Sequence, residues 1–392
     1  MWGDEMPATN GHANGLAREL HPSPLLPDGF TVPSSRWTNP STRFRQALDA
    51  LPYVFAPGTY DPYTAQLLMY YGFPAVYLSG YSFAMGHVGS TDMDLYSSVE
   101  IADGARRVVS ALRKFQLTMA VGDPDAGFSP RHLDIPPVIV DMDGGYGNAF
   151  NVQRTTELYV TAGVAGAHIE DQVLPKRCGH IAGKAVIETG EMIGKLRMMR
   201  AVADDLGNKD FVVIARTDAV SAVDAPERLR GMPLAVERAC RYLDSGLPDL
   251  VWCELPTSAR GPIEEFSTQV RKRFPEARFG FNFSSSFKWH LDTDPISFAE
   301  LGELGYRFLF ITLAAIHANG LGFSRLLADL ATREGEAYIG LQQQEWAPEL
   351  DLPSRSHHLF SGVPYHHLLG NAFGAARLGR DVQEQFRDES AV

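Results

Sequence analysis

The fold of this chain is decided by the stretch Phe211-Val212-Val213-Ile214-Ala215-Arg216-Thr217-Asp218. It is a short, continuous apolar run that ends in polar side chains, which is typical of a parallel strand buried on both faces. Longer amphipathic stretches flank it, at Thr189–Asp205 before it and at Glu227–Ser245 after it. A strand between two helices predicts an α/β unit of a parallel sheet.

The same unit recurs along most of the chain. Amphipathic stretches such as Asp61–Tyr71 and Val152–Ala162 also predict helices. Eight strand–helix alternations predict an α/β protein built as a (β/α)8 TIM-type barrel. A doubly wound open sheet is the alternative, but the Gly-rich dinucleotide fingerprint of that fold does not follow the first strand. The eight predicted strands are Tyr53–Ala56, Ala75–Ser79, Val138–Asp143, Ala167–Asp171, Phe211–Asp218, Leu250–Glu254, Phe279–Phe283 and Phe308–Leu313.

The barrel accounts for only the middle of the chain. Residues 1–40 are the predicted N-terminal arm and lead-in, and we expect a mobile arm because residues 1–35 are rich in Pro, Gly, Asn and Ser without apolar periodicity. Residues 41–335 are the predicted barrel. Residues 336–392 exceed what the last barrel helix needs, so we expect additional C-terminal helices that pack on a neighbouring subunit. For the end of this tail, a solvated extension is an equal alternative.

Charge and cysteine content exclude several classes of protein. The net charge is −12, from 35 basic and 47 acidic residues, which argues against general binding to nucleic acid or to anionic membranes. Three scattered cysteines are too few for a disulfide framework, so a reducing, cytoplasmic setting is expected. The first residues lack the apolar core of a signal peptide, and no apolar run reaches the ~20 residues that span a bilayer. We expect a soluble protein.

Polar side chains stand at the end of nearly every predicted strand. Side chains two residues apart point to the same face of a strand. Such groups at the carboxyl ends of barrel strands predict a large polar site at one mouth of the barrel. The groups that share a face are Tyr77 and Ser79, Asp141 and Asp143, His168 and Glu170, Arg216 and Asp218, Trp252 and Glu254, Asn282 with Ser284 and Ser286, and Phe310 and Thr312.

Three of these groups predict a metal site. Asp141, Asp143 and Glu170 offer only oxygen ligands, which suit Mg²⁺ or Mn²⁺ better than Zn²⁺. A zinc site with Cys178 and neighbouring histidines is the alternative, but its spacing is not a common zinc pattern.

The segment Lys176-Arg177-Cys178-Gly179-His180 predicts a reactive thiol. Its cationic neighbours favour the thiolate, so we expect a lowered Cys178 pKa. The segment lies in a long connection, Gln172 to Val186, and such connections often act as active-site lids. A basic surface turn with a chance cysteine is the alternative. Cys240 and Cys253 are expected to be buried and inert.

With this segment the chain resembles isocitrate lyases, within the isocitrate lyase/phosphoenolpyruvate mutase superfamily. The resemblance covers roughly residues 42 to 345 and includes Tyr77-Leu78-Ser79-Gly80, Asp141 to Gly147, Ala167 to Gln172, Ile214 to Asp218, Asn282 to Phe287 and Phe310 to Leu313. It implies a (β/α)8 barrel and a homotetramer with C-terminal helices exchanged between subunits. The implied reaction is Mg²⁺-dependent cleavage of isocitrate to glyoxylate and succinate, a step of the glyoxylate cycle.

The resemblance also implies roles for single residues. Cys178 would be the general acid and Tyr77 the candidate base, with His180 and Arg216 also in the catalytic group. The metal would be held by Asp141, Asp143 and Glu170, joined by Asp92. The glyoxylate part would lie among Ser79, Gly80, Tyr81, Asp141 and Arg216. The succinate carboxylates would be bound by Gly179, His180, Asn282, Ser284, Ser286 and Thr312, with Glu254 among the substrate-binding residues.

Three departures leave the substrate open. Many isocitrate lyases carry Trp, Glu and Lys where this chain has Tyr81, Asp143 and Arg177, and the last two choices resemble 2-methylisocitrate lyases. Trp252 and Phe310 match isocitrate lyases instead. Outside lyase chemistry, the chain could be a hydrolase acting on a 2-oxo acid such as oxaloacetate, or a non-catalytic relative. His357, His358, His366 and His367 are expected to form a solvated or interfacial segment rather than a metal cluster, and Asn319-Gly320 to mark a turn or a helix interruption.

Overall fold

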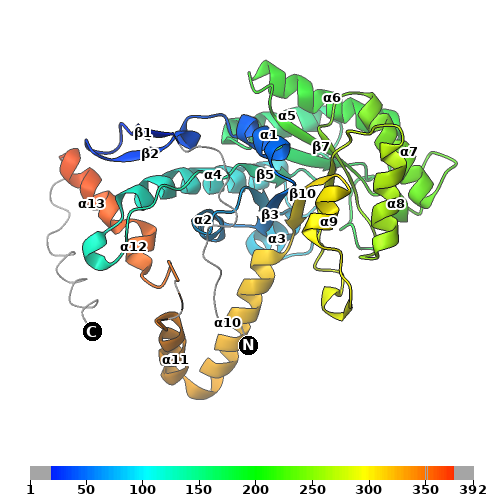
Figure 1. Cartoon of the computed structure of the whole chain (residues 1–392). Coiled ribbons are helices and arrows are strands. Elements are labelled where there is room, and N and C mark those ends of the chain that lie inside the picture. Colours follow the sequence, from blue (N-terminus) through cyan, green and yellow to red (C-terminus); the bar gives the residue numbers. More distant parts are fainter. Residues whose placement is uncertain (1–18, 349, 351, 375–392) are drawn as a thin grey trace.

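In the computed structural model, which describes residues 19–348, 350 and 352–374, eight parallel strands close into a barrel (Figure 1). Neighbours around the barrel follow the order of the chain, and the last strand pairs with the first. The (β/α)8 prediction is therefore confirmed, and each observed strand overlaps one of the eight predicted runs, with bounds that differ by up to three residues. They are β3 (Val54–Thr59), β4 (Val76–Leu78), β5 (Val138–Asp141), β6 (Gly166–Glu170), β7 (Val212–Thr217), β8 (Leu250–Cys253), β9 (Phe279–Asn282) and β10 (Tyr306–Ile311).

Helices surround the barrel, and several of them begin at a side-chain cap. The Asp61 side chain accepts a hydrogen bond from the Thr64 amide at the start of α2, and Ser97 and Glu100 form a capping box at the start of α4. The bounds of α6 match the predicted ones. The helices up to the last strand are α1 (Pro40–Ala50), α2 (Pro62–Tyr70), α3 (Gly80–Phe83), α4 (Ser98–Val121), α5 (Ala149–Ala162), α6 (Thr189–Asp205), α7 (Gly231–Asp244), α8 (Arg260–Arg271) and α9 (Phe298–Glu303).

The two-residue period of β7 positions the functional end of that strand. Val213 and Ala215 pack outward against the helices, whereas Val212 and Ile214 belong to the cluster inside the barrel. The next side chain on the inner face is Arg216. The same strand therefore supplies barrel packing below and a charged group at the mouth.

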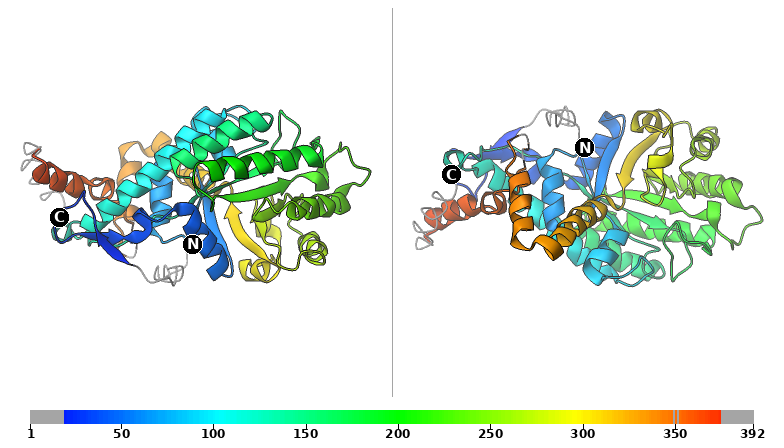
Figure 2. Two further views of the ribbon diagram at one scale, coloured as in Figure 1. Left: turned by 90° about the horizontal axis from the view of Figure 1, so that it is seen from above. Right: turned by 90° about the horizontal axis from the view of Figure 1, so that it is seen from below.

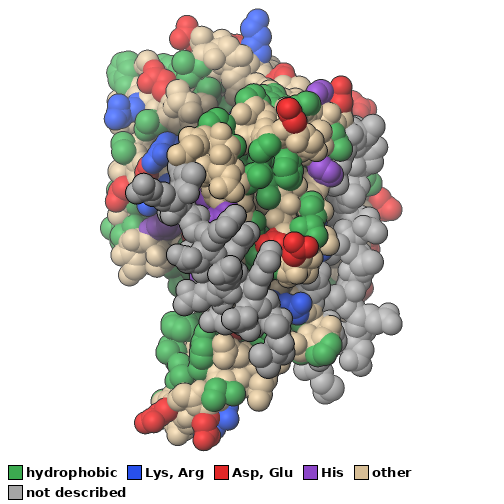
Figure 3. Space-filling model, turned by 90° about the vertical axis from the view of Figure 1, so that its left-hand side faces the viewer, with side chains coloured by type: hydrophobic (Ala, Val, Ile, Leu, Met, Phe, Trp, Pro, Cys, Tyr) green, Lys and Arg blue, Asp and Glu red, His purple; other side chains and the backbone are tan. Residues whose placement is uncertain are grey.

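The chain after β10 leaves the barrel. Helices α10 (Ala314–Arg333) and α11 (Gly335–Glu345) project from the body as a helical hairpin (Figure 1), and no residue of α10 is buried. Figure 3 shows hydrophobic side chains on this projecting part, at the bottom of the view. Helix α10 runs unbroken through Asn319-Gly320, so the predicted interruption there is wrong. The side-chain amide of Asn319 donates to the Tyr60 hydroxyl at 2.8 Å, and neither side chain is part of the core.

The N-terminal arm is structured over its second half. Strands β1 (Leu20–Pro22) and β2 (Thr31–Pro33) pair antiparallel, and Val32 is buried in a cluster with Leu117 of α4 and Tyr365 of α13 (Val363–Ala372). Figures 1 and 2 show this hairpin and α13 beside the same part of α4, with α12 (His357–Ser361) close by. The prediction that the arm has no packed structure is therefore wrong for residues 19–35, because its few apolar side chains pack against residues from distant parts of the chain. Residues 1–18 and 375–392, which include the ends of the predicted arm and tail, lie outside the described residues. Among the helices described, none combines the length and the apolar character needed to cross a membrane.

Candidate active site

The polar strand ends predicted from the sequence meet at the carboxyl mouth of the barrel. Asp141 of β5 joins the loop after β4 to this mouth: its carboxylate accepts hydrogen bonds from the Asp143 amide at 2.9 Å and from the Gly80 amide at 3.3 Å. A Cβ at Gly80 would lie 2.6 Å from the Asp141 Oδ2, so only glycine allows this approach. The Ser79 hydroxyl accepts from the Ser82 amide at 3.0 Å and caps α3.

Lys176 lies between two of the predicted metal ligands. Its amine is 2.5 Å from Asp92 and 2.6 Å from Asp143, and all three side chains are buried. Burial opposes the charge of Lys176, but the two carboxylates outweigh it and raise the pKa of the amine. Sequence reasoning placed this lysine with the thiol, and the structure corrects that interpretation.

Arg216 is held by carboxylates on two sides. It donates to Asp218 through Nε at 2.8 Å and through a terminal nitrogen at 3.0 Å, and its other terminal nitrogen lies 3.1 Å from Glu170. The guanidinium also stacks on the Trp252 ring at 4.3 Å. Burial opposes the charge of Asp218, but Arg216 and Lys184 outweigh it and hold the pKa of this carboxyl well below its usual range. Arg216 is thus fixed in orientation before any ligand arrives.

The Cys178 thiol is neutral in this arrangement, which corrects the predicted thiolate. Burial raises the pKa of Cys178 to about 11, although the His180 amide acts in the opposite direction. The three expected activators point elsewhere: Lys176 toward Asp92, Arg177 to the Ala182 carbonyl at 3.0 Å, and the His180 ring to Glu254 at 2.8 Å. The thiol therefore carries its proton at neutral pH.

Aromatic rings close the barrel below these charges. Tyr77 and Phe310 lie 4.6 Å apart, and Trp252 lies 4.9 Å from both Phe310 and His168. The Tyr77 hydroxyl is 2.7 Å from the His168 Nε2 and 3.5 Å from Asp141. Burial raises the pKa of Tyr77 well above its ordinary value, and burial lowers that of His168 to about 4. Both groups are therefore neutral here. Sequence reasoning placed His168 among the polar groups at the mouth but gave it no catalytic or binding role.

The remaining predicted substrate residues lie at the ends of β4, β9 and β10, and the Ser82 hydroxyl after β4 donates to the Thr312 carbonyl at 3.0 Å. The Thr312 hydroxyl donates to the Asn282 side chain at 2.9 Å, and the Ser284 hydroxyl accepts from the Ser286 amide at 3.1 Å. Ser286 is exposed and Tyr81 is half-buried, so both face the open side.

The carboxylate cluster fits a divalent cation in its chemistry. Both carboxylate oxygens of Asp143 and one of Glu170 are buried without a hydrogen-bond partner, although one Asp143 oxygen lies 2.6 Å from the Lys176 amine. Burial raises the pKa of Asp143 to about 7 and that of Glu170 well above its usual value, so the cluster is short of positive charge. Within residues 19–374 as described, no three His, Cys, Asp or Glu side chains already converge on one point. A cation bound here would therefore need waters and substrate oxygens to complete its coordination shell, as is common for Mg²⁺.

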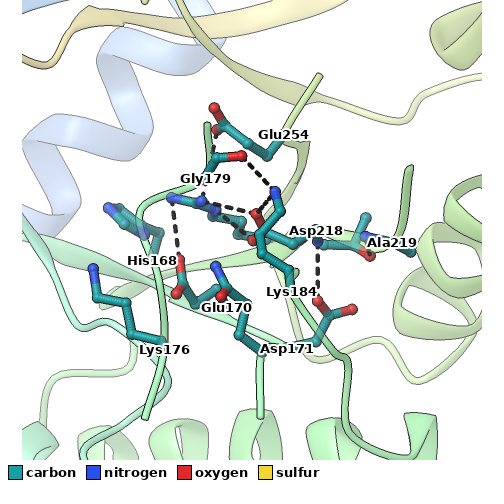
Figure 4. A network of polar contacts seen from close by, with 12 residues as sticks. His168, Glu170, Asp171, Lys176, Gly179, Lys184, Asp218, Ala219 and Glu254 are labelled. Atoms are coloured by element: carbon teal, nitrogen blue, oxygen red, sulfur yellow. Dashed lines mark hydrogen bonds and ion pairs between the residues drawn. The ribbon is translucent and has the colours of Figure 1, made fainter. Parts of the chain in front are cut away.

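A buried network behind the mouth was missed by sequence reasoning (Figure 4). Asp171 accepts from the Asp218 amide at 3.0 Å, from Arg238 at 2.9 Å and from the Tyr242 hydroxyl at 2.7 Å. Lys184 donates to Asp218 at 2.7 Å. A lysine in a polar connection and an arginine in an amphipathic segment look like solvent-facing residues, and only their burial marks them out. Cys240 and Cys253 are buried as expected.

Comparison with known proteins places this chain in a family. The family model described as phosphoenolpyruvate phosphomutase matches residues 44–314. The chain is 36% identical to isocitrate lyase of Haloferax volcanii over 88% of this chain and 91% of that protein, and 33% identical to 2,3-dimethylmalate lyase of Eubacterium barkeri over 71% and 82%. A crystal structure of 2,3-dimethylmalate lyase superposes with a TM-score of 0.67 at 28% identity, covering 87% of this chain and 98% of that one. An oxaloacetate acetylhydrolase complex with 3,3-difluorooxalacetate superposes with a TM-score of 0.66 at 26% identity, covering 86% and 97%. The chain belongs to the phosphoenolpyruvate mutase/isocitrate lyase superfamily.

Proposed function

We propose that this carbon–carbon lyase cleaves isocitrate to glyoxylate and succinate. The observation that carries the proposal is the half-buried Cys178 thiol, on a loop that packs against Arg216 at a mouth lined by buried carboxylates. Burial raises the pKa of this thiol to about 11. A retro-aldol cleavage needs an acid that holds a proton until a carbanion forms, and a thiol with a raised pKa is suited to that task. The similarity to the Haloferax isocitrate lyase over 88% of the chain supports the choice of substrate.

The binding groups divide between the two products. We assign the glyoxylate part to Ser79, Gly80, Tyr81, Asp141 and Arg216, which offer hydroxyl and carboxylate groups and a guanidinium of fixed orientation. The succinate carboxylates are assigned to the ends of β8, β9 and β10 and to the Cys178 loop. Those residues are Gly179, His180, Glu254, Asn282, Ser284, Ser286 and Thr312.

Asp141, Asp143, Glu170 and Asp92 would hold Mg²⁺, or Mn²⁺ in its place. When bound, the cation would supply Lewis-acid stabilisation for the forming aldehyde oxygen. Arg216 orients the carboxylate next to that oxygen, and Lys176 keeps Asp92 and Asp143 together.

Two proton movements complete the reaction. The substrate hydroxyl loses its proton to a base, for which Tyr77 remains our candidate; its raised pKa means that it can act only once positive charge lies near Asp141. The carbon–carbon bond then breaks and its electron pair stays on the succinate carbon. The Cys178 sulfur gives its proton to this carbon and is left as thiolate.

A second candidate, 2-methylisocitrate cleavage to pyruvate and succinate, is favoured by Asp143 and Arg177. The similarity to a lyase of the methylated acid 2,3-dimethylmalate points in the same direction. A methyl group is worth only ~1–3 kcal/mol of discrimination in a pocket, so one site can accept both acids. We also propose a homotetramer that exchanges its C-terminal helices, because the α10–α11 hairpin is apolar and lies off its own barrel.

The test is a steady-state assay with Mg²⁺ and isocitrate, with 2-methylisocitrate and oxaloacetate in parallel. We expect glyoxylate from isocitrate, lost on addition of EDTA and reduced ~10²–10⁴-fold in Cys178→Ser. Pyruvate from 2-methylisocitrate alone would move the function to the second candidate. Oxalate from oxaloacetate, without glyoxylate from isocitrate, would contradict the lyase assignment.

A further inference from the structure

Lys184 is a buried charged side chain that the proposed reaction does not use. Its side chain is only 1% exposed, and its amine donates to two groups, the Gly179 carbonyl at 2.5 Å and the Asp218 carboxylate at 2.7 Å. A buried ammonium loses its hydration, so a buried lysine is more costly to fold than a solvent-exposed lysine or a buried apolar side chain. The two contacts of this amine therefore need an explanation.

The first contact reaches the tip of the Cys178 loop. This loop is closed at its base, where Gln172 and Val186 form a bridge and the Val173 amide donates to the Ala185 carbonyl at 2.9 Å. Lys184 stands just inside that base and reaches across to the carbonyl of Gly179, which directly follows Cys178. The position of the thiol is thus tied to the base of its own loop.

The second contact reaches the group that orients Arg216. One oxygen of Asp218 accepts from Lys184 at 2.7 Å and from Arg216 at 3.0 Å, so the two cations share it. Figure 4 shows Lys184 between Gly179 and Asp218. A chain of hydrogen bonds therefore runs from the loop backbone through Lys184 and Asp218 to Arg216.

The loop backbone and Arg216 are also in direct contact. A Cβ at Gly179 would collide with the Arg216 guanidinium and would lie 2.7 Å from the Glu254 Cγ. The loop backbone therefore lies directly on the arginine, and a small shift of the loop would change the distance between thiol and bound carboxylate.

We propose that Lys184 is a positioning residue that fastens the Cys178 loop to Arg216 and so sets the thiol relative to the bound substrate. As far as turnover is concerned, this rests on the proposed function. Without Lys184, Asp218 still holds Arg216 through two hydrogen bonds, so the carboxylate-binding group stays in place while the loop is released. The loss should appear in proton delivery rather than in substrate binding.

The test compares Lys184→Met with Lys184→Arg and with a matched control, Lys195→Met. Lys195 is also 2% exposed, but its amine donates to the Gly144 carbonyl at 2.8 Å instead of to the loop. In the full-length protein without substrate, we measure iodoacetamide labelling of Cys178 and tryptic cleavage after Arg177 by peptide mass spectrometry. We expect both rates to rise at least about fivefold in Lys184→Met, since local opening exposes the loop. They should be unchanged in Lys195→Met and intermediate in Lys184→Arg.

Kinetics supply the second readout. We expect kcat of Lys184→Met to fall on the order of 100-fold, because small misplacements of a reacting group have costs of this size, with KM changed less than about threefold. Unchanged labelling and cleavage would overturn the proposal, as would a rise in KM with kcat intact. If the unmodified protein cleaves none of the acids offered, the proposed function fails, whereas the labelling and cleavage rates still decide the role of Lys184. If Lys184→Met does not fold, Lys184→Arg carries the same comparison.

Discussion

Burial and charge are distributed in opposite ways in the barrel mouth and in the α10–α11 hairpin. At the mouth and directly behind it, cations such as Lys176 and Arg238 are buried, and each is paired with carboxylates of the same chain. In the hairpin, no residue of α10 is buried, and Leu321 and Phe323 are 51% and 61% exposed. At the mouth, buried charges pair with groups of the same chain, whereas the hairpin has an apolar surface that the described part of its own chain does not cover. This difference implies that the mouth and the hairpin respond differently to mutation.

The largest effect is expected from breaking a buried pair behind the mouth. Arg238→Met removes the cation that pairs with Asp171 at 2.9 Å and leaves a buried carboxylate short of a partner. Such a change typically costs ~3–5 kcal/mol of unfolding free energy. Urea unfolding at fixed protein concentration measures it. Arg241→Met, an exposed position on the same helix, should stay within ~0.5 kcal/mol, and equal losses in both variants would contradict the assigned network.

The hairpin is tested by charging its apolar surface. If it packs on a neighbouring subunit, Phe323→Asp combined with Leu327→Asp should lower the mass of the assembly, since each such side chain contributes ~1.5–3 kcal/mol when buried. Light scattering coupled to gel filtration measures the mass. The barrel itself should keep its circular dichroism spectrum. Leu206→Asp, at an exposed apolar position on the barrel, is the control. An unchanged mass in the double variant would contradict the proposed exchange of helices between subunits.

The thiol at the mouth gives a prediction about pH. Because burial raises the Cys178 pKa to about 11, the thiolate forms only as pH rises toward that value. Iodoacetamide labelling of Cys178 in the free enzyme should therefore increase about tenfold per pH unit from pH 7 to 10 without a plateau. Peptide mapping separates it from Cys240 and Cys253. A plateau near pH 8 would indicate the activated thiolate that the sequence suggested.

The smallest effect concerns the N-terminal hairpin, which shows that an exposed-looking segment can be packed by its own chain. Val32 is completely buried against Leu117 and Tyr365. Val32→Ala should lower the unfolding free energy by roughly 1–2 kcal/mol, the value of two methyl groups. Thermal melting monitors it, with Thr31→Ala, a half-buried neighbour, as the control. A change of mass in Val32→Ala would mean that β2 contributes to an interface instead.

The sequence was sufficient for the barrel because its signal is local. Each strand is a continuous apolar run, so the strands and their polar ends, including Asp141 and Arg216, could be predicted one at a time. Hairpin β1–β2 was missed because Val32 is buried by residues from α4 and α13, and nothing near it in sequence indicates that. The unbroken α10 was missed for a related reason, since Asn319 and Gly320 weaken a helix without deciding its end.

Within the site, the residue types were predictable but the directions of long side chains were not. Lys176 is two residues from Cys178, yet its amine reaches Asp92 and Asp143. Lys184 is six residues away from Cys178 and contacts the loop backbone. A lysine amine can reach acceptors far from its own backbone, so its partner is set by the tertiary structure. The pKa of the Cys178 thiol is set by the tertiary structure for the same reason, because it depends on where the neighbouring charges point.

The aromatic floor formed by Tyr77, His168, Trp252 and Phe310 has a kinetic consequence. These rings are packed and almost fully buried, so the barrel offers no second exit on that side. Two fragments made from one molecule must then leave through the opening by which that molecule entered, one after the other. The fragment that lies nearer the floor leaves last and returns to the empty enzyme, so it should inhibit competitively, whereas the first to leave should not. The order of departure can thus be read from inhibition patterns alone.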